Sequence, residues 1–243
     1  MSRTKDKLFS RRQRLIKDFN FGKQTATVFD DMLQRSVPFY SEVQRMISEI
    51  ASDCVTEGSQ VYDLGCSTCA TFLALDRVVP AGVRFIGVDA SADMLRRGRE
   101  KLTEHQFRHE YELQHADLNQ GVQVVNASMV VMTLTLQFIR PLYRHKLLSD
   151  IAKGMNEQGC LILVEKVLSR HSMLNRLFIK YYYGFKERNG YTKLEIAQKR
   201  EALENILIPY RAEENTELLL TSGFSQCDLF FKWYNFCGLI AVK

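Results

Sequence analysis

Long apolar runs are missing from this sequence. No stretch approaches the ~18 consecutive apolar residues that a membrane-spanning helix needs, so we expect no membrane segment. The first seven residues, Met1 to Lys7, contain no apolar core, so we expect no signal peptide and a cytoplasmic location. Internal repeats and low-complexity segments are also absent.

Several catalytic constellations are missing as well. The sequence has no Ser-His-Asp order and no phosphate-binding loop, and none of its five histidines has an evident partner. Cys66 and Cys69 form a C-x-x-C pair, which leaves redox or zinc chemistry open as a minor alternative. No second such pair and no paired histidine accompanies it, so we expect no metal and six reduced core thiols.

The composition is that of a globular protein. The 243 residues are 46% hydrophobic and 25% charged, which suits a single domain over residues 1–243. The formal net charge of +5 is compatible with anionic substrates but too small to argue for nucleic acid as a partner. We interpret the basic cluster between Arg11 and Lys17 as a solvated terminal arm.

The middle of the chain alternates between strand and helix patterns. The stretch Val61-Tyr62-Asp63-Leu64-Gly65 is apolar and then breaks at a glycine, which is typical of a buried parallel strand followed by a tight turn. Further strands are predicted at 83–88, 109–115, 127–134 and 160–164, with helices at 71–79, 91–104 and 141–153 between them. Such alternation indicates right-handed βαβ units and an α/β, Rossmann-like fold.

The two ends of the chain add other elements. We predict an N-terminal helical cap over 1–54, made of an arm with two aromatic anchors (Phe19 and Phe21) and helices over 24–35 and up to Ala51. A two-helix insertion is predicted over 170–209, with its turn at Asn189-Gly190. After a helix over 213–221, strands at 224–231 and 235–242 predict an antiparallel hairpin, for seven strands in a mostly parallel sheet.

Three aspartates, Asp63, Asp89 and Asp117, lie at or just past the ends of successive predicted strands and suggest a cofactor site. A carboxylate after the second strand, Asp89, can accept both hydroxyls of a ribose, and one after the third, Asp117, can accept from an adenine amino group. The alternative is that these residues cap helices. Only Gly65 of a G-x-G-x-x-G pattern is present, which is a poor cradle for a pyrophosphate and favours S-adenosylmethionine (SAM) over NAD.

Longer motifs resemble those of the carboxy-S-adenosyl-L-methionine (carboxy-SAM) synthases, which have the class I SAM-dependent methyltransferase fold. The resemblance covers nearly the whole chain. It rests on Arg35-Ser36-Val37-Pro38 with Tyr40, Val61 to Ser67, Asn126 to Val131, Thr135 to Phe138, Glu165-Lys166, and the block from Phe185 to Asn205 that contains Gln198-Lys199-Arg200.

That resemblance implies a reaction on SAM itself, in which SAM and prephenate give carboxy-SAM and phenylpyruvate. A separate enzyme then uses the product to modify a tRNA wobble uridine, so no direct nucleic-acid partner is expected. The family pattern implies that Arg200 clamps the new carboxylate and that Tyr40 assists catalysis. The SAM-binding residues it implies are Tyr40, Gly65, Cys66, Ser67, Asp89, Ala90, Asp117, Leu118, Thr133 and Arg200.

The sequence departs from the family pattern at Thr133 and Ala90, where the family usually has Asn, and near Cys69, where it has Gly. Other uses of SAM therefore stay open: cyclisation to azetidine-2-carboxylate and methylthioadenosine, methyl transfer to a small molecule, or SAM binding without turnover. The cluster Tyr181-Tyr182-Tyr183 can send at most one or two rings into a site. We expect it mainly to pack the insertion on the core or on a second subunit in a homodimer.

Overall fold

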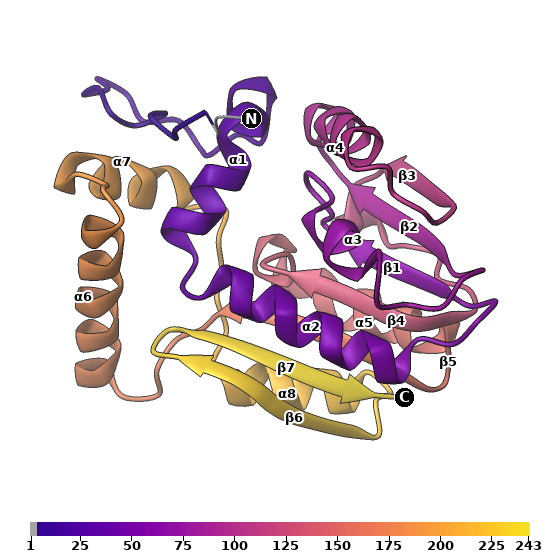
Figure 1. Ribbon diagram of the computed structural model, residues 1–243. Coiled ribbons are helices and arrows are strands. Elements are labelled where there is room, and N and C mark those ends of the chain that lie inside the picture. Colours follow the sequence, from indigo (N-terminus) through magenta and orange to yellow (C-terminus); the bar gives the residue numbers. More distant parts are fainter. Residues whose placement is uncertain (1–3) are drawn as a thin grey trace.

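A seven-stranded sheet forms the centre of the protein, in a computed structural model that describes residues 4–243 (Figure 1). Its strands are β1 (Gln60–Leu64), β2 (Arg84–Asp89), β3 (Tyr111–His115), β4 (Ala127–Thr133), β5 (Met155–Lys166), β6 (Gln226–Trp233) and β7 (Phe236–Val242). They lie in the order β3-β2-β1-β4-β5-β7-β6. The first five run parallel, and β7 is antiparallel to both β5 and β6. The predicted mostly parallel sheet with a C-terminal hairpin is confirmed.

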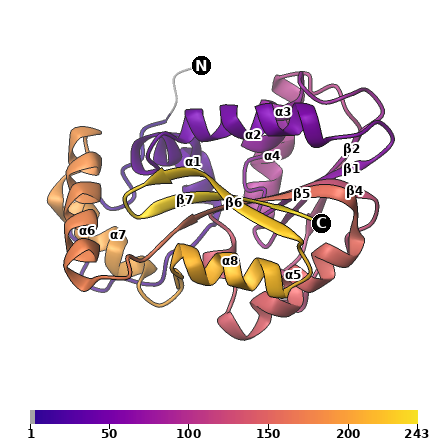
Figure 2. The same ribbon diagram turned by 90° about the horizontal axis from the view of Figure 1, so that it is seen from below.

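Helices cover both faces of this sheet, as Figure 2 shows. One face carries α2 (Tyr40–Cys54), α3 (Ala70–Leu75) and α4 (Ala92–Glu104), and the other carries α5 (Pro141–Gly154) and α8 (Ala212–Thr221). Every residue of β4 up to Met132 is buried, because a central parallel strand has apolar neighbours on both sides. The expected doubly wound core therefore consists of two apolar layers, one on each face.

The remaining helices lie beyond the edge where the parallel strands end (Figure 1). They are α1 (Lys23–Ser36), α6 (Ser172–Arg188) and α7 (Lys193–Leu203), and short 3-10 turns follow β3 (η1, Leu118–Gln120) and β4 (η2, Leu136–Phe138). Gly190 has a φ of +81° at the predicted turn between α6 and α7. A capping box of Thr192 and Glu195 then starts α7, so the insertion folds as predicted.

Some predicted boundaries were wrong. The helix predicted over 71–79 ends at Leu75 and continues only as a turn, in which Val78 and Val79 donate their backbone N–H groups to the Leu75 carbonyl. The strand predicted over 109–115 begins at Tyr111. The strand predicted over 160–164 extends to Met155–Lys166, because Met155 pairs with Ala127 of β4 at one end and Glu165 and Lys166 pair with β7 at the other.

Within residues 4–243, none of the helices combines the length and the apolar character needed to span a bilayer. The basic side chains of Arg11, Arg12, Arg14 and Lys17 are exposed, as predicted. The segment that carries them, which we call the arm (residues 4–22), is nevertheless docked. Asp6 in the arm is 2% exposed, and Phe19 donates its backbone N–H to the carbonyl of Ala202 in α7.

Candidate functional site

A cavity of about 340 Å³ lies at the carboxyl ends of the parallel strands, under the arm, α1 and α7. Its volume falls in the range of about 300–1,000 Å³ that is usual for small-molecule sites. Most residues that the sequence proposed for SAM line it: Tyr40, Gly65, Cys66, Ser67, Asp89, Ala90, Asp117, Leu118 and Thr133. The structure therefore gathers nine positions from five separate segments of the chain.

Arg200 differs from this expectation. Its side chain is exposed and does not line the cavity, whereas the preceding residue, Lys199, does. Successive side chains on an α-helix point about 100° apart, and in α7 this turns Lys199 toward the cavity and Arg200 toward solvent. In this chain Lys199, and not Arg200, therefore lies at the cavity, and the predicted role of Arg200 stays a prediction.

The turn after β1 is built on Gly65, whose φ is +85°. A Cβ at this position would lie 2.2 Å from the Thr135 Oγ1, so the loop after β4 occupies the space that a side chain would need. Ser67 and Cys69 also adopt positive φ values, of 46° and 58°. Cys69 thus has the left-handed backbone conformation that glycine adopts most easily, and its side chain makes this conformation strained.

Asp89 joins two loops at the end of β2. Its Oδ2 accepts the backbone N–H of Ser67 at 2.9 Å, and its Oδ1 accepts that of Ser91 at 2.8 Å. The cap of α4 is Ser91, whose Oγ accepts from Met94 N, so Asp89 is not the helix cap. Burial raises the pKa of Asp89, whereas the two amides favour its ionised form.

Asp117 does act as a cap. Its Oδ1 accepts both the backbone N–H and the side-chain amide of Asn119, at 2.9 and 2.8 Å, at the start of η1. Its Oδ2 has no hydrogen bond to any residue from 4 to 243. The Oδ1 of Asp117 therefore caps η1, and its Oδ2 is available to a ligand, so the two predictions are compatible.

Thr133 has a buried hydroxyl with no hydrogen-bond partner among the described residues, and it lines the cavity. A buried hydroxyl without a partner is costly, and a polar ligand group would satisfy it. Thr133 takes the place of an expected Asn, and its hydroxyl can still donate and accept. This orphaned group fits a ligand with polar atoms at the end of β4.

Asp63 is the most perturbed carboxylate that lines the cavity. Its side chain is 2% exposed and its pKa is raised to about 7, mainly by burial; a hydrogen bond with Thr71 opposes the rise, and the charge of Asp89 adds to it. The phenol of Tyr40 is also buried, which raises its pKa, and Asp63 adds to that effect. A desolvated carboxylate of this kind is suited to a cationic ligand such as a sulfonium or an ammonium.

The loop after β4 is fixed by Glu165. Its carboxylate accepts the backbone N–H groups of Thr135, Leu136 and Gln137 at 2.8–3.0 Å. Burial raises the pKa of Glu165 to about 8, and the three amides oppose that rise. Glu165 thus positions the loop that packs against Gly65.

The arm completes the cavity. Phe19 and Phe21 line it, and the ring of Phe21 packs edge-on against Phe138 at 5.4 Å between centroids. Sequence reasoning identified these two rings as anchors but did not assign them to the site. The available signal was that two aromatic residues occur close together in an otherwise polar segment.

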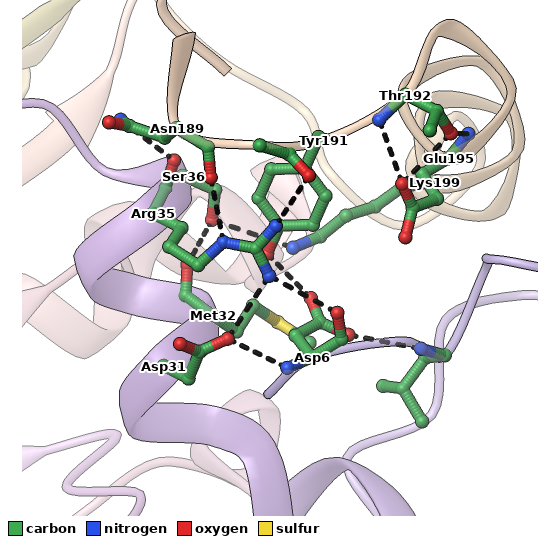
Figure 3. A network of polar contacts seen from close by, with 12 residues as sticks. Asp6, Asp31, Met32, Arg35, Ser36, Asn189, Tyr191, Thr192, Glu195 and Lys199 are labelled. Atoms are coloured by element: carbon green, nitrogen blue, oxygen red, sulfur yellow. Dashed lines mark hydrogen bonds and ion pairs between the residues drawn. The ribbon is translucent and has the colours of Figure 1, made fainter. Parts of the chain in front are cut away.

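A polar network holds the arm to α1 and to the insertion (Figure 3). The Tyr191 Oη donates to Asp6 Oδ2 at 2.6 Å, and the backbone N–H of Asp6 donates to Asp31 Oδ2 at 2.7 Å. Arg35 donates to the carbonyls of Asn189 and Gly190 at 2.8 and 2.9 Å, and its guanidinium stacks 4.0 Å from the centre of the Tyr191 ring. These contacts join the first 35 residues to the insertion across 154 to 185 residues of sequence.

Cys66 and Cys69 are buried free thiols, and burial together with the Cys69 thiol raises the pKa of Cys66. Over the part of the chain that the structure describes, no group of three or more His, Cys, Asp or Glu residues is placed to hold a metal ion. Of the three consecutive tyrosines, only Tyr182 lines the cavity; Tyr181 stacks on Tyr234 at the surface. That is the division predicted from helical geometry.

Comparisons with known proteins identify the fold and the family. Residues 61–159 match the model of a methyltransferase domain. An O-methyltransferase family protein from Burkholderia thailandensis has a similar structure (TM-score 0.67, 12% identity, covering 95% of this chain and 65% of that one). A SAM-dependent methyltransferase from Aquifex aeolicus has a TM-score of 0.60 at 14% identity, covering 93% of this chain and 99% of that one. These likenesses show the class I methyltransferase fold.

Two curated relatives match over almost their whole length. The carboxy-S-adenosyl-L-methionine synthase of Methylococcus capsulatus is 55% identical over 99% of this chain and 100% of its own. The protein of the same name from Sulfurimonas denitrificans is 43% identical over 98% of this chain and 99% of its own. At this level of similarity, the chain belongs to the carboxy-S-adenosyl-L-methionine synthase family.

Proposed function

We propose that this chain makes carboxy-SAM from SAM, with prephenate as the donor of the carboxyl group. It is a SAM-dependent transferase, and SAM is its substrate. The observation that carries the proposal is 55% identity to a carboxy-SAM synthase over 99% of the chain. The cavity supports it, because nine positions proposed for SAM lie around one space.

The proposed reaction balances without an external oxidant or reductant. Prephenate loses CO₂ and hydroxide as its ring becomes aromatic, which leaves phenylpyruvate. The SAM methyl group loses a proton, and the resulting carbanion attacks CO₂ to form the new C–C bond. The proton and the hydroxide leave as water.

The carboxylates of the cavity suit the hydroxyl and amino donors of SAM as well as its cationic part. We assign Asp89 to the ribose hydroxyls, the free Oδ2 of Asp117 to the adenine amino group, and the Thr133 hydroxyl to a polar atom of the ligand. Asp63, buried beside Tyr40, would face the positively charged part of the molecule. Gly65, Cys66, Ser67, Ala90 and Leu118 would shape the wall against which SAM lies.

Arg200 is proposed as the clamp for the product carboxylate on the family resemblance alone. Arg200→Lys keeps the charge but loses the planar fork that pairs with both carboxylate oxygens. If the role is right, Arg200→Lys and Arg200→Ala both lower carboxy-SAM formation and leave SAM binding intact. Equal activity of the wild type and both variants would remove Arg200 from the site.

We also propose a homodimer and a cytoplasmic location. Exposed apolar side chains gather on and beside α6, where Tyr181 and Tyr234 stack 5.0 Å apart and Met173 is 67% exposed. Six free thiols fit a reducing compartment. Light scattering of the eluted protein tests the dimer, and a monomeric mass at micromolar concentration would refute it.

Product analysis by mass spectrometry tests the reaction. The protein is incubated with SAM alone and then with SAM and prephenate. We expect carboxy-SAM and phenylpyruvate in equal amounts, only when both substrates are present. Methylthioadenosine formed from SAM alone would indicate a cyclase, and S-adenosylhomocysteine formed only with an added acceptor would indicate a methyltransferase. Tight SAM binding with no product under any condition would indicate a sensor.

A further inference from the structure

Three lysines meet near the cavity without a counter-ion. Lys166 is the last residue of β5, Lys186 lies in α6 and Lys199 in α7. Lys186 is 5% exposed and Lys199 8%, whereas Lys166 is half-buried. None of the three makes an ion pair with any of residues 4–243, and their single side-chain hydrogen bond runs from Lys199 Nζ to Ser36 Oγ at 3.5 Å.

The three ammonium groups are close enough to act on one another. Lys166 Nζ lies 5.5 Å and Lys186 Nζ 4.8 Å from the centre of the Tyr182 ring. The Tyr182 hydroxyl donates to the carbonyl of Ser36, whose own hydroxyl accepts from Lys199. The pKa of Lys186 is lowered to about 7, mainly by burial and in part by repulsion from Lys199 and Lys166. The pKa of Lys199 falls to about 8, mainly through burial.

Neighbouring groups do not neutralise this cluster. The face of Tyr182 attracts the ammonium groups but carries no net charge. Asp6 acts on Lys199 from a distance and raises its pKa, but it forms no ion pair with any of the three lysines among residues 4–243, and its oxygens accept from Tyr191 and from the backbone of Leu8. A buried cation without a partner destabilises a folded chain, and an anionic ligand would remove that cost.

The cluster lies at the opposite side of the cavity from the aspartates. Lys166, Tyr182 and Lys199 line the cavity, as do Asp89 and Asp117. Asp117 follows β3 and Lys166 ends β5. In the sheet, β2, β1 and β4 lie between these two strands. With strands about 4.8 Å apart, the two sides are roughly 19 Å apart along the sheet edge. One cavity therefore has an acidic side for a cation and a basic side for an anion.

We propose that Lys166, Lys186 and Lys199 bind the carboxylate that the second substrate retains, in a dicarboxylate that gives up its other carboxyl group as CO₂. This inference rests on the proposed function, which requires such a donor beside SAM. An ammonium group beside the departing carboxylate would stabilise its charge and oppose formation of neutral CO₂. The lysines therefore hold the carboxylate that remains, and the other carboxylate lies toward the apolar lining between the two sides.

Lysine-to-methionine variants test the proposal, because methionine keeps the length of the side chain and removes the charge. The variants are K186M and K199M, with the half-buried K166M as a further variant should either fail to fold. The matched control is K180M, since Lys180 is exposed on the same helix as Lys186. The measurements are thermal unfolding, calorimetric binding of SAM, binding of prephenate in the presence of SAM, and the KM for prephenate.

We expect K186M and K199M to unfold at the wild-type temperature or above it, because each loses a buried unpaired charge. Their Kd for SAM should stay within twofold of the wild type, and the Kd and KM for prephenate should rise at least tenfold. K180M should match the wild type throughout. Unchanged prephenate binding in both variants would overturn the proposal, and so would an equal weakening of SAM binding, which would assign the lysines to the carboxylate of SAM itself.

The outcomes separate this inference from the proposed function. A wild-type protein that binds prephenate through these lysines but makes no carboxy-SAM would refute the function and keep the anion site. A wild-type protein that makes carboxy-SAM, with variants of unchanged KM, would refute the anion site and keep the function. A wild-type protein with SAM bound that does not bind prephenate would refute both.

Discussion

Asp63 offers a direct test of how the cavity is tuned for a cation. The carboxyl is 2% exposed, and its pKa is raised from a usual value of 3.8 to about 7. Because the folded chain holds this proton more tightly than the unfolded chain, the contribution of Asp63 to stability is greatest at low pH. It falls as the pH rises from about 4 through 7 and is constant above that. Asp63→Asn cannot ionise, so the loss of stability that comes from charging the buried carboxyl at high pH is absent in this variant.

The size of the effect follows from the shift. Each unit of pKa difference corresponds to about 1.4 kcal/mol, so the interval from pH 5 to pH 7 corresponds to about 3 kcal/mol. The free energy of unfolding of D63N, relative to the wild type, should increase by about that amount between pH 5 and pH 8. In a chain of this size, the corresponding difference in Tm is about 6–12 °C. Any penalty from the altered hydrogen bond with Thr71 does not change this pH-dependent part.

Urea unfolding of the wild type and D63N at pH 5, 6, 7 and 8 measures the effect. Asp53→Asn is the matched control, because Asp53 is exposed near the end of α2. Its difference from the wild type should not change with pH. A D63N difference that is also the same at all four pH values would refute the reasoning that burial controls the ionisation of Asp63.

SAM binding tests the ionisation of Asp63 in a second way, and two further predictions concern Gly65 and Tyr191. A cationic ligand favours ionised Asp63, so the Kd for SAM should fall by up to about tenfold per unit from pH 5 to pH 7 in the wild type and not in D63N; parallel pH profiles would contradict this. Gly65→Ala should lower the stability by about 2–4 kcal/mol, because its Cβ would lie against the Thr135 side chain and because the φ of Gly65 is +85°. Chemical unfolding measures the loss. Thr135→Ala should restore part of it, because it removes the Oγ1 and Cγ2 atoms nearest the new Cβ, and no recovery would contradict the clash. Tyr191→Phe leaves a buried Asp6 oxygen without its donor and should weaken docking of the arm by about 1–3 kcal/mol; faster amide exchange in residues 4–22 would show it, and exchange at the wild-type rate would contradict it.

Strand positions and the cofactor edge could be predicted from the sequence, because both depend on local patterns. Val61 to Gly65 contains an apolar run, a carboxylate and a glycine in order, and each has a local physical meaning. The three aspartates were expected at one edge because the carboxyl ends of parallel strands meet there. Their different uses could not be predicted: Asp117 caps a turn, whereas Asp89 joins two loops, and both outcomes depend on which amides the fold places nearby.

The residues that sequence reasoning missed act through distant partners. Lys199 and Arg200 are adjacent and chemically similar, and only the rotation of α7 about its axis decides which one faces the cavity. The arm looked solvated because it is polar, yet Asp6 is buried through bonds to Tyr191 and Asp31. Contacts across about 185 residues leave no periodic signal in the sequence.

The polar network between the arm and the insertion has a consequence for how the protein folds. Asp6 meets Tyr191, and Gln13 meets Gln198, each across 185 residues, so the arm has no place to dock until α6 and α7 have folded. Contacts of such long range close late, because the loop entropy must be overcome before they form. The sheet can therefore assemble first, and the top of the cavity closes as one of the last events. A nascent or partly unfolded chain would have its strands in order and still be unable to retain a ligand.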